Sequence, residues 1–337
     1  MDKKKIPNHI FFIYGLKKQE QEFLFYAYLS ILSAKIVNNP KCIYFYYHYE
    51  PFGHWWDKTK LLVTLKKINI PTHWGKKKII HYAHAADKIR VELLYNQGGI
   101  YMDIDTISIR PYHHLLEHQC VLGYQDNPEG LCNAVMMCQP KCLFFKKWLS
   151  IYKRRYISSR GPGTPGWDNA SIKLPYKIYL SNKNLVTMLE KESFFYPNWS
   201  QTEKIFEEDT QIDSNLITLH LWESTSMKYL EKIENFDWFK NNPQTLYGRI
   251  GLKLIDDYNL ENYNDIPKII HQTWKTNEIP SKMKFCIDSW KILNPNYKYI
   301  LWTDKDIDNF INKNYPQYYS VFKKTNLGIQ KADIFRI

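Results

Sequence analysis

The sequence predicts an α/β protein built on a mainly parallel sheet, and three observations lead to this fold class. Short runs of β-branched and aromatic residues are typical of buried strands. Longer segments with apolar residues at helical spacing separate these runs. Strands and helices that alternate along a chain indicate a parallel sheet whose strands are joined by crossover helices.

The first three elements form a strand–helix–strand unit. Residues 6–15, IPNHIFFIYG, are apolar and aromatic and end at a glycine, so we expect a buried strand. Residues 20–38 repeat apolar side chains at helical spacing, and the Asn-Asn-Pro that follows ends the helix. Residues 41–49, KCIYFYYHY, are expected to form the second strand.

The following elements lead to a pair of acids. Residues 81–97 have the pattern of a long helix, and Gly98-Gly99 can take the positive φ of a C-terminal cap. Residues 100–109, IYMDIDTISI, are predicted to form one strand. Further along the chain we expect buried strands at 120–125 and 133–139, an amphipathic helix at 143–156 and a Gly/Pro-rich loop at 160–170.

The sequence also contains an internal repeat. Residues 266–275, IPKIIHQTWK, parallel residues 6–15, and QKADIFR at 330–336 parallels HAADKIR at 84–90. We therefore predict a first domain over 1–250, a polar linker over 251–265 and a truncated second copy over 266–337. This second copy stops before the position that would correspond to the acid pair, and it is expected to be catalytically silent.

Composition excludes several classes of protein. The chain has 337 residues, 44% of them hydrophobic and 24% charged, which is typical of a folded globular protein. Its net charge of +12 suits an anionic partner, but no nucleic-acid-binding signature is present. The six cysteines contain no CxxC pair, so they indicate reduced core thiols. No segment has the length and apolarity of a signal peptide or membrane span, and we expect a cytoplasmic or virion-associated protein.

The acids Asp103 and Asp105 are the first candidates for chemistry. Residues i and i+2 of a strand point to the same face, so the two carboxylates are expected to converge while Ile104 turns to the core. Two converging carboxylates suit Mg²⁺ or Mn²⁺. The alternative is a strand end with two solvated acids.

The helix before this strand carries a second pair. Asp87 and Arg90 are three residues apart and share a helix face. Arg90 could bind a phosphate or a carboxylate, and Asp87 could accept hydrogen bonds from sugar hydroxyls. A surface ion pair is the alternative for these two residues.

The run ADKIRVELLYNQGGIYMDID at 86–105 resembles the DXD-containing sugar-binding region of Och1-like mannosyltransferases, α-1,4-galactosyltransferases and large clostridial glucosylating toxins. The matching positions include Asp87, Arg90, Tyr101, Asp103 and Asp105. The resemblance implies a GT-A type nucleotide-sugar-binding fold. It also implies a metal-dependent transferase that retains the anomeric configuration.

The resemblance implies roles for residues elsewhere in the chain. The segment 9–15 is similar to the family's first strand, which places Ile13 and Tyr14 near the nucleotide base. Asn133 would lie near the donor sugar, and HLWESTS at 220–226 would supply a metal ligand and donor contacts. The implied residues are, for the metal, Asp103, Asp105 and His220; for catalysis, Asp103, Asp105 and Arg90; and for the substrate, Ile13, Tyr14, Asp87, Arg90, Tyr101, Asn133, Trp222 and Ser224.

These observations lead to a functional hypothesis. The protein would move a hexose from a nucleotide sugar to a hydroxyl of a glycan, protein or lipid, with Mn²⁺ or Mg²⁺ as cofactor. A UDP-hexose is favoured over GDP-mannose. The alternatives are a non-catalytic carbohydrate- or nucleotide-sugar-binding protein and a nucleotide-sugar hydrolase. The Lys-, Asn-, Ile- and Tyr-rich composition suggests an AT-rich genome, such as that of a large virus or a parasite.

Overall fold

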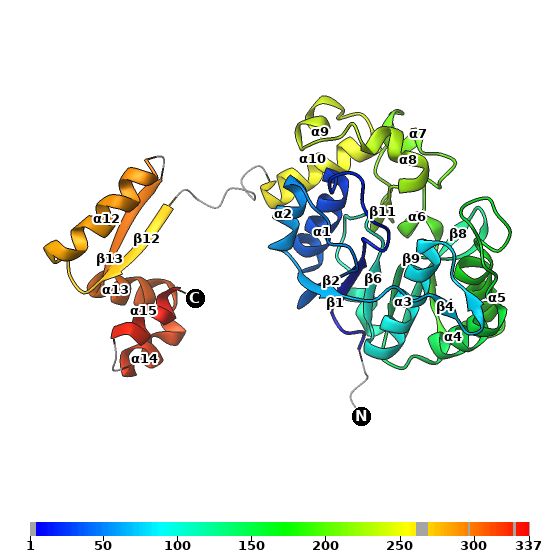
Figure 1. The fold of residues 1–337 in the computed structure, drawn as a ribbon, viewed down its shortest axis with the longest axis horizontal. Helices are drawn as coiled ribbons and strands as arrows, with labels where there is room; N and C mark the ends of the chain where they lie inside the picture. The colour runs from blue at the N-terminus through cyan, green and yellow to red at the C-terminus, as the bar shows by residue number, and fades with distance from the viewer. Residues whose placement is uncertain (1–4, 261–268, 296, 326–327, 337) are drawn as a thin grey trace. The chain divides into compact units, whose positions relative to one another are not determined.

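The computed structural model describes residues 5–260, 269–295, 297–325 and 328–336, and the chain divides into two compact units, Met1–Glu261 and Asn262–Ile337 (Figure 1). The division between the units falls within the linker predicted over 251–265. Among the described helices, none is both long and apolar enough to cross a bilayer.

The first unit is built on a mainly parallel sheet, which confirms the predicted α/β fold class. Within the described residues the sheet has seven strands, in the order β10-β8-β9-β6-β1-β2-β3. Strand β9 runs antiparallel to both of its neighbours, and the other neighbouring pairs are parallel. The strands are β1 (His9–Ile13), β2 (Cys42–Tyr47), β3 (Thr64–Lys67), β6 (Gly99–Met102), β8 (Cys120–Asp126), β9 (Glu129–Cys138) and β10 (Thr187–Leu189).

Helices cover both faces of this sheet, as Figure 1 shows. Side chains of β1 alternate between two apolar cores, because successive residues of a strand point to opposite faces. Ile10 and Phe12 lie in the core that contains α1 (Phe25–Asn38) and α10 (Leu246–Tyr258). Phe11 and Ile13 lie in the core that contains α3 (Tyr82–Gln97) and α4 (Leu143–Arg155). A sheet buried on both faces explains the continuous apolar runs of β1 and β2.

Helix α3 (Tyr82–Gln97) leads directly into β6, the strand that ends just before the acid pair. It begins at His81, whose side chain accepts a hydrogen bond from the N–H of Ala83, and it ends at Gly98. Gly98 and Gly99 have φ values of 66° and 113°, and a Cβ on Gly98 would meet the ring of Pro140 at 2.6 Å. Glycine is therefore required where the helix returns directly into β6.

The remaining elements of the first unit are short. Two pairs of strands lie outside the main sheet: β4 (His73–Trp74) with β5 (Lys77–Lys78), and β7 (Thr106–Ser108) with β11 (Thr218–His220). The other α-helices are α2 (His54–Lys60), α4 (Leu143–Arg155), α5 (Leu174–Leu180), α6 (Lys191–Phe194), α7 (Glu203–Phe206), α8 (Glu223–Leu230) and α9 (Asp237–Asn241).

The prediction of a linker over 251–265 is wrong for its first eight residues, 251–258, which are helical. Residues 251–258 belong to α10, and Leu254 and Ile255 are buried in the core of the first unit. Thr245 begins this helix by accepting a hydrogen bond from the N–H of Gly248. The segment appeared polar because its charged residues cover the outer face of an amphipathic helix. Residues 261–265 lie outside the described residues.

The second unit contains β12 (Ile269–Trp274), α12 (Ser281–Leu293), β13 (Lys298–Thr303), α13 (Asp304–Asn314), α14 (Pro316–Lys324) and α15 (Gly328–Arg336). Strands β12 and β13 pair in parallel and are connected by α12, which is the same order as β1, α1 and β2. Ile307, Ile311 and Phe322 form a small core. Helix α12 leaves Phe285 80% exposed, whereas α1 is almost completely buried.

Candidate functional site

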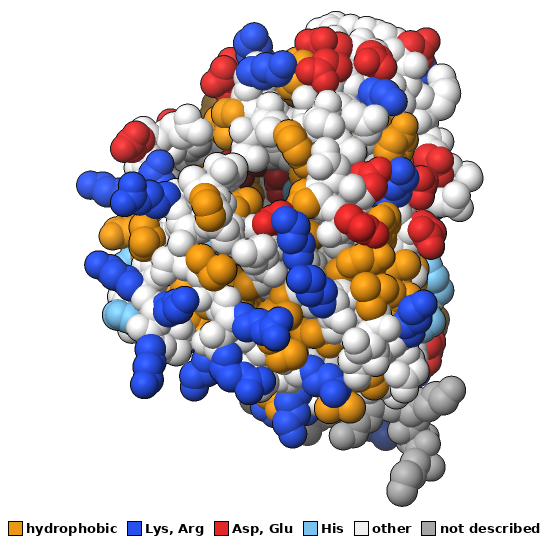
Figure 2. Space-filling model, turned by 90° about the vertical axis from the view of Figure 1, so that its right-hand side faces the viewer, with side chains coloured by type: hydrophobic (Ala, Val, Ile, Leu, Met, Phe, Trp, Pro, Cys, Tyr) orange, Lys and Arg blue, Asp and Glu red, His pale blue; other side chains and the backbone are white. Residues whose placement is uncertain are grey.

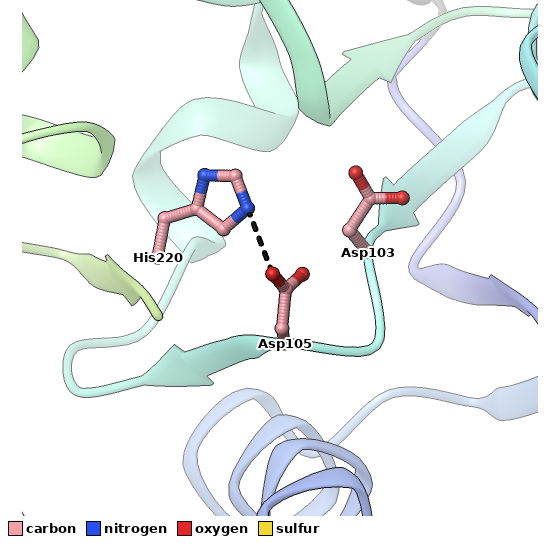
Figure 3. A group of neighbouring side chains, drawn as sticks. All are labelled: Asp103, Asp105 and His220. Atoms are coloured by element: carbon pink, nitrogen blue, oxygen red, sulfur yellow. Dashed lines mark ion pairs between the residues drawn. The ribbon is translucent and has the colours of Figure 1, made fainter. Parts of the chain in front are cut away.

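Asp103 and Asp105 lie on a turn between β6 and β7. The N–H and hydroxyl groups of Thr106 both donate to the backbone oxygen of Asp103, at 3.2 and 2.7 Å. The prediction of one continuous strand over 100–109 is therefore wrong, because the chain turns directly at the acids. Ile104 is buried, as expected, and both carboxylates still lie on the same side (Figure 3).

The short pairing of β7 with β11 brings His220 to this turn. His220 is the register partner of Thr106, and the N–H of Leu221 donates to the backbone oxygen of Asp105 at 2.8 Å. Nε2 of His220 lies 3.2 Å from Oδ2 of Asp105 (Figure 3). Asp103, Asp105 and His220 each offer a ligand atom, and these atoms lie within 4.8 Å of one another. The structure thus brings together the three residues predicted to hold a metal.

The carboxyl group of Asp105 is kept ionised by its contacts. Burial raises its pKa, but His220 and the backbone N–H of Glu223 outweigh this effect, so the pKa is lowered from its usual value. The N–H of Glu223 donates to Oδ2 of Asp105 at 2.7 Å. An anionic oxygen held in place by such contacts is a ready ligand for a cation.

Asp103 is held by two neighbours from α3 and β6. Nη1 of Arg90 lies 3.0 Å from Oδ1 of Asp103, and the hydroxyl of Tyr101 donates to the same oxygen at 2.5 Å. Burial raises the pKa of Asp103 despite the opposing charge of Arg90. Tyr101, predicted as a substrate contact, is itself completely buried, and in this structure its hydroxyl positions the carboxylate.

Arg90 is buried beneath the acid pair. Its Nη1 also donates to the backbone oxygen of Asn133 at 3.1 Å, and its guanidinium carbon lies 4.5 Å from the centre of the Tyr101 ring. Nε lies 3.8 Å from Oδ1 of Asp87. In this structure Arg90 holds Asp103 and the strand end, and its contact with a phosphate stays a prediction.

Asp87 and Asn133 form a second pair beside Arg90. The amide nitrogen of Asn133 donates to Oδ1 of Asp87 at 2.7 Å, and the hydroxyl of Tyr152 from α4 donates to Oδ2 at 3.3 Å. All three side chains are buried. Because Asp87 and Arg90 are both buried, they do not form the surface ion pair that was the alternative for them. The structure brings both residues into the cluster where the resemblance placed the donor sugar.

Glu223 belongs to the cluster, although sequence reasoning missed it. It is the first residue of α8 and follows Trp222, whose φ of 57° turns the backbone toward Asp105. Burial and the charge of Asp105 raise the pKa of Glu223 to about 7, although a hydrogen bond with Tyr26 opposes this shift. An acid directly after the His-x-Trp segment was the available signal, but its partner Tyr26 lies far away in the sequence.

The raised pKa of Glu223 predicts a pH dependence of stability. Between its ordinary value of 4.5 and about 7 the unfolded chain releases this proton while the folded chain keeps it. Stability should therefore fall as the pH rises through this window. We expect Glu223→Gln to remove that part of the decline, measured as the free energy of unfolding against pH in EDTA. Parallel curves for the two proteins would contradict the assignment.

The other predicted substrate contacts lie around the cluster at different depths. Tyr14 follows β1 and is half-buried, and burial and the charge of Glu223 raise its pKa. Ile13 is buried at the end of β1, and Ser224 is exposed in the first turn of α8. Nε1 of Trp222 donates to the backbone oxygen of Pro197 at 2.8 Å, and its ring lies 3.9 Å from that of His220.

The charge of the cluster fits a hard divalent cation. Among the described residues of the cluster there are four carboxyl groups, those of Asp87, Asp103, Asp105 and Glu223, and one guanidinium, that of Arg90, which contacts Asp87 and Asp103. Carboxylate oxygens and an imidazole nitrogen are common ligands of Mn²⁺, and carboxylate oxygens of Mg²⁺. The residues could therefore hold either ion, and a bound cation would offset the repulsion between Asp103 and Asp105.

Comparison with known proteins identifies the family. Residues 26–122 and 280–337 match the family described as a glycosyltransferase sugar-binding region containing a DXD motif. Glucan organizing enzyme 1 of Cryptococcus neoformans is 34% identical over 246 residues, which cover 68% of this chain and 65% of that protein. The chain belongs to the DXD-containing glycosyltransferase family.

Other relatives of this DXD-family chain are also fungal. Inositol phosphoceramide mannosyltransferase 3 of Schizosaccharomyces pombe is 46% identical over 93 residues, and these cover 25% of each chain. Mannosyl phosphorylinositol ceramide synthase CSH1 of Saccharomyces cerevisiae is 47% identical over 75 residues, covering 21% of this chain and 19% of that protein. The chain thus spans less than two thirds of Glucan organizing enzyme 1, and a quarter or less of the two yeast proteins.

Solved structures of glycosyltransferases resemble the DXD-family chain distantly. The galactosyltransferase LgtC has a TM-score of 0.40 at 10% identity, with 82% of this chain and 99% of that chain covered. GlyE of Streptococcus pneumoniae has a TM-score of 0.40 at 13% identity, with 88% of this chain and 74% of that chain covered.

Proposed function

We propose that the first unit is a metal-dependent, retaining glycosyltransferase that moves a hexose from a nucleotide sugar to a hydroxyl of a glycan, lipid or protein. The observation that carries this proposal is the grouping of Asp103, Asp105 and His220 within 4.8 Å, above a buried network of Asp87, Arg90 and Asn133. Such a group in a DXD-family chain suits a cation that binds the diphosphate of the donor.

The residues of the cluster would have different roles in catalysis. Asp103, Asp105 and His220 would hold Mn²⁺ or Mg²⁺, which when bound neutralises charge on the departing diphosphate. Arg90 would keep Asp103 in position, and its charge favours the same leaving group. Asp87, fixed by Asn133 and Tyr152, would orient the hydroxyls of the sugar. These fixed groups need little reorganisation when substrate arrives.

The remaining predicted contacts would bind the rest of the donor. Ile13 and Tyr14 at the end of β1 would lie beside the nucleotide base. Trp222, Ser224 and the segment around β11 would close the other side of the donor. Because Tyr101 is buried under Asp103, it would act by positioning that acid rather than by touching substrate.

The relatives support two finer parts of the proposal. The names of the yeast relatives contain mannose and inositol phosphoceramide, which supports a mannosyl donor and a lipid acceptor with hydroxyl groups. UDP-hexoses, favoured from the sequence, remain candidates for the donor. The viral origin and the cytoplasmic or virion location stay predictions. The three relatives named above are fungal proteins.

We also propose that residues 266–337 repeat the first part of the first unit and hold no catalytic site of their own. The order β12-α12-β13 repeats that of β1-α1-β2, and the family region matches both units. The repeat reaches QKADIFR at 330–336, the counterpart of 84–90, so residues 266–337 contain no counterpart of Asp103 and Asp105. Transferase activity that persisted after deletion of residues 1–261 would contradict this division.

A donor screen tests the proposed function. We expect one of UDP-glucose, UDP-galactose, UDP-GlcNAc, UDP-GalNAc or GDP-mannose to raise the melting temperature of the full chain when Mn²⁺ is present. A ligand that binds the folded state stabilises it by about 2.7 kcal/mol at about 100 times its Kd. The screen is repeated in EDTA, where the shift should disappear.

The alternatives give different outcomes in the same experiment. A donor shift that is unchanged in EDTA would argue for a non-catalytic sugar-nucleotide-binding protein. Release of free sugar at the same rate with and without acceptors would argue for a hydrolase. No shift with any donor would contradict the proposed transferase.

A further inference from the structure

The positive charge of the chain is concentrated in one segment. Residues 141–183 contain ten Lys and Arg residues and a single acid, Asp168, so this short segment carries a formal charge of +9 out of the +12 of the whole chain. The segment includes α4 and α5, which pack together on one side of the sheet. Charge this localised indicates a surface adapted to an anionic partner.

The structure gathers these side chains on one face, which we call the α4–α5 face. Figure 2 shows Lys and Arg side chains spread over the side of the first unit to which α4 and α5 belong. A hollow of about 510 Å³ lies there, and none of the described residues that line it is acidic. Its basic lining residues are Lys147, Arg154, Arg155 and Lys177.

The charges of this face are left uncompensated by the protein. Among the described residues, none of Lys147, Arg154, Arg155 and Lys177 lies within 4.0 Å of a carboxylate, and all four are exposed. Asp168, the acid of this segment, is already paired with Lys173 at 2.9 Å. Four like charges around one hollow repel one another, so an anionic partner would relieve this repulsion.

A neighbouring hairpin extends the face. The hydroxyl of Ser158 donates to the backbone oxygen of Lys78, and the ring of Trp74 lies 3.6 Å from that of Tyr152 on α4. These contacts attach β4 and β5 to the end of α4. Lys76, Lys77 and Lys78 are exposed on this hairpin and add three charges.

Exposed aliphatic side chains lie on the same elements as the cations. Ile157 is 43% exposed after α4, Leu180 is 52% exposed at the end of α5, and Ile80 is 56% exposed after β5. Cations mixed with exposed aliphatic groups suit the interface of a bilayer, where lipid headgroups bind the charges and the aliphatic groups enter the acyl boundary. A site for single-stranded nucleic acid would instead present aromatic platforms along a groove.

We propose that the α4–α5 face docks the protein on the surface of an anionic lipid bilayer. Lys147, Arg154, Arg155 and Lys177 bind the headgroups, and Ile157 and Leu180 enter the interface beside them. This inference rests on charge and exposure and is independent of the metal cluster. It would hold a transferase at the surface on which lipid-linked acceptors are presented.

Vesicle sedimentation tests the proposal with the full chain. We expect the protein to sediment with phosphatidylcholine vesicles that contain about 30 mol% phosphatidylserine, and not with phosphatidylcholine alone, at about 0.15 M salt. The variant that replaces Lys147, Arg154, Arg155 and Lys177 by Ser should lose about 600-fold in partitioning, since each of the four basic side chains contributes roughly fivefold.

A matched control removes the same charge elsewhere. Lys41, Lys66, Lys67 and Lys232 lie outside α4, α5 and the hairpin and are also exposed, and their replacement by Ser should leave partitioning within about threefold of the parent. The melting temperatures of both variants without ligand should equal that of the parent, which shows that they are folded. Equal losses of partitioning in the two variants would mean a nonspecific charge effect and would overturn the proposal.

Two further outcomes decide between lipid and other anions. Ile157→Ser with Leu180→Ser should weaken vesicle binding while leaving its dependence on phosphatidylserine, because the aliphatic contribution is lost. If a single-stranded RNA oligonucleotide displaced the protein from vesicles and the Ile157 and Leu180 changes had no effect, the partner would be nucleic acid. Absence of sedimentation with phosphatidylserine vesicles would also overturn the proposal.

Discussion

Asp105→Asn should reduce kcat/KM for sugar transfer by at least about a hundredfold, since even changes behind a metal ligand cost about 10–100-fold. Asp105 combines an ionised carboxylate, a backbone N–H contact at 2.7 Å and the proximity of His220, so it is the best-prepared ligand in the cluster. The amide retains the shape and can still accept from the N–H of Glu223. It removes the charge that attracts the cation.

The fold should survive this change. Asn keeps the size of the buried side chain and removes its repulsion with Asp103, but it loses the charge-assisted contact with His220, so we expect the free energy of unfolding in EDTA to fall by at most about 3 kcal/mol. Asp209→Asn is the matched control, because Asp209 pairs with Arg249 away from the cluster and should keep full activity. Measured turnover and Mn²⁺ titration would refute the metal hypothesis if Asp105→Asn behaved like this control.

Arg90→Lys should lower Mn²⁺ affinity or turnover by about 10–100-fold, the usual cost of disturbing a group that positions a metal ligand. One planar guanidinium contacts Asp103, the backbone oxygen of Asn133 and the region of Asp87 together. An ammonium group is a point charge and cannot reproduce this fork. We also expect a loss of about 1.5–3 kcal/mol in stability, the value of one charge-assisted hydrogen bond.

Two titrations separate the roles of Arg90. Binding of a nucleoside diphosphate in EDTA reports direct contact with phosphate, whereas Mn²⁺ binding without nucleotide reports the positioning of Asp103. An unchanged affinity for the diphosphate would count against the phosphate role. Arg249→Lys is the control, since Arg249 pairs with Asp209 at the surface. Normal metal affinity together with normal stability in Arg90→Lys would contradict the positioning role.

Local sequence patterns predicted the elements that carry the first half of the site. The helix predicted over 81–97 is α3, and the two glycines after it have the positive φ that the tight return into β6 requires. Apolar runs predicted β1, β2, β8 and β9 because strands buried on both faces are apolar at every position. The acids and Arg90 were found because they lie close together in the sequence.

Features that depend on distant contacts escaped prediction. The turn at 103–105 is closed by Thr106, but a continuous apolar pattern on both sides concealed it. The amphipathic character of α10 became clear only with its partner core, so its charged outer face suggested a linker. Glu223 and Tyr152 enter the cluster through contacts with Asp105 and Asp87, which no local spacing reveals.

The pairing of β7 with β11 has a consequence for tolerance to insertions. The histidine reaches the acids through three register pairs, Thr218 with Ser108, Leu219 with Ile107 and His220 with Thr106. A slip by one residue turns every side chain of a strand to the opposite face. One residue added within 218–220 would therefore bury the imidazole in the core and turn Leu219 toward the acids, while the rest of the sheet kept its form. Whether the proposed metal ligands come together thus depends on the number of residues in the three-residue strand β11 as much as on the identity of the ligands.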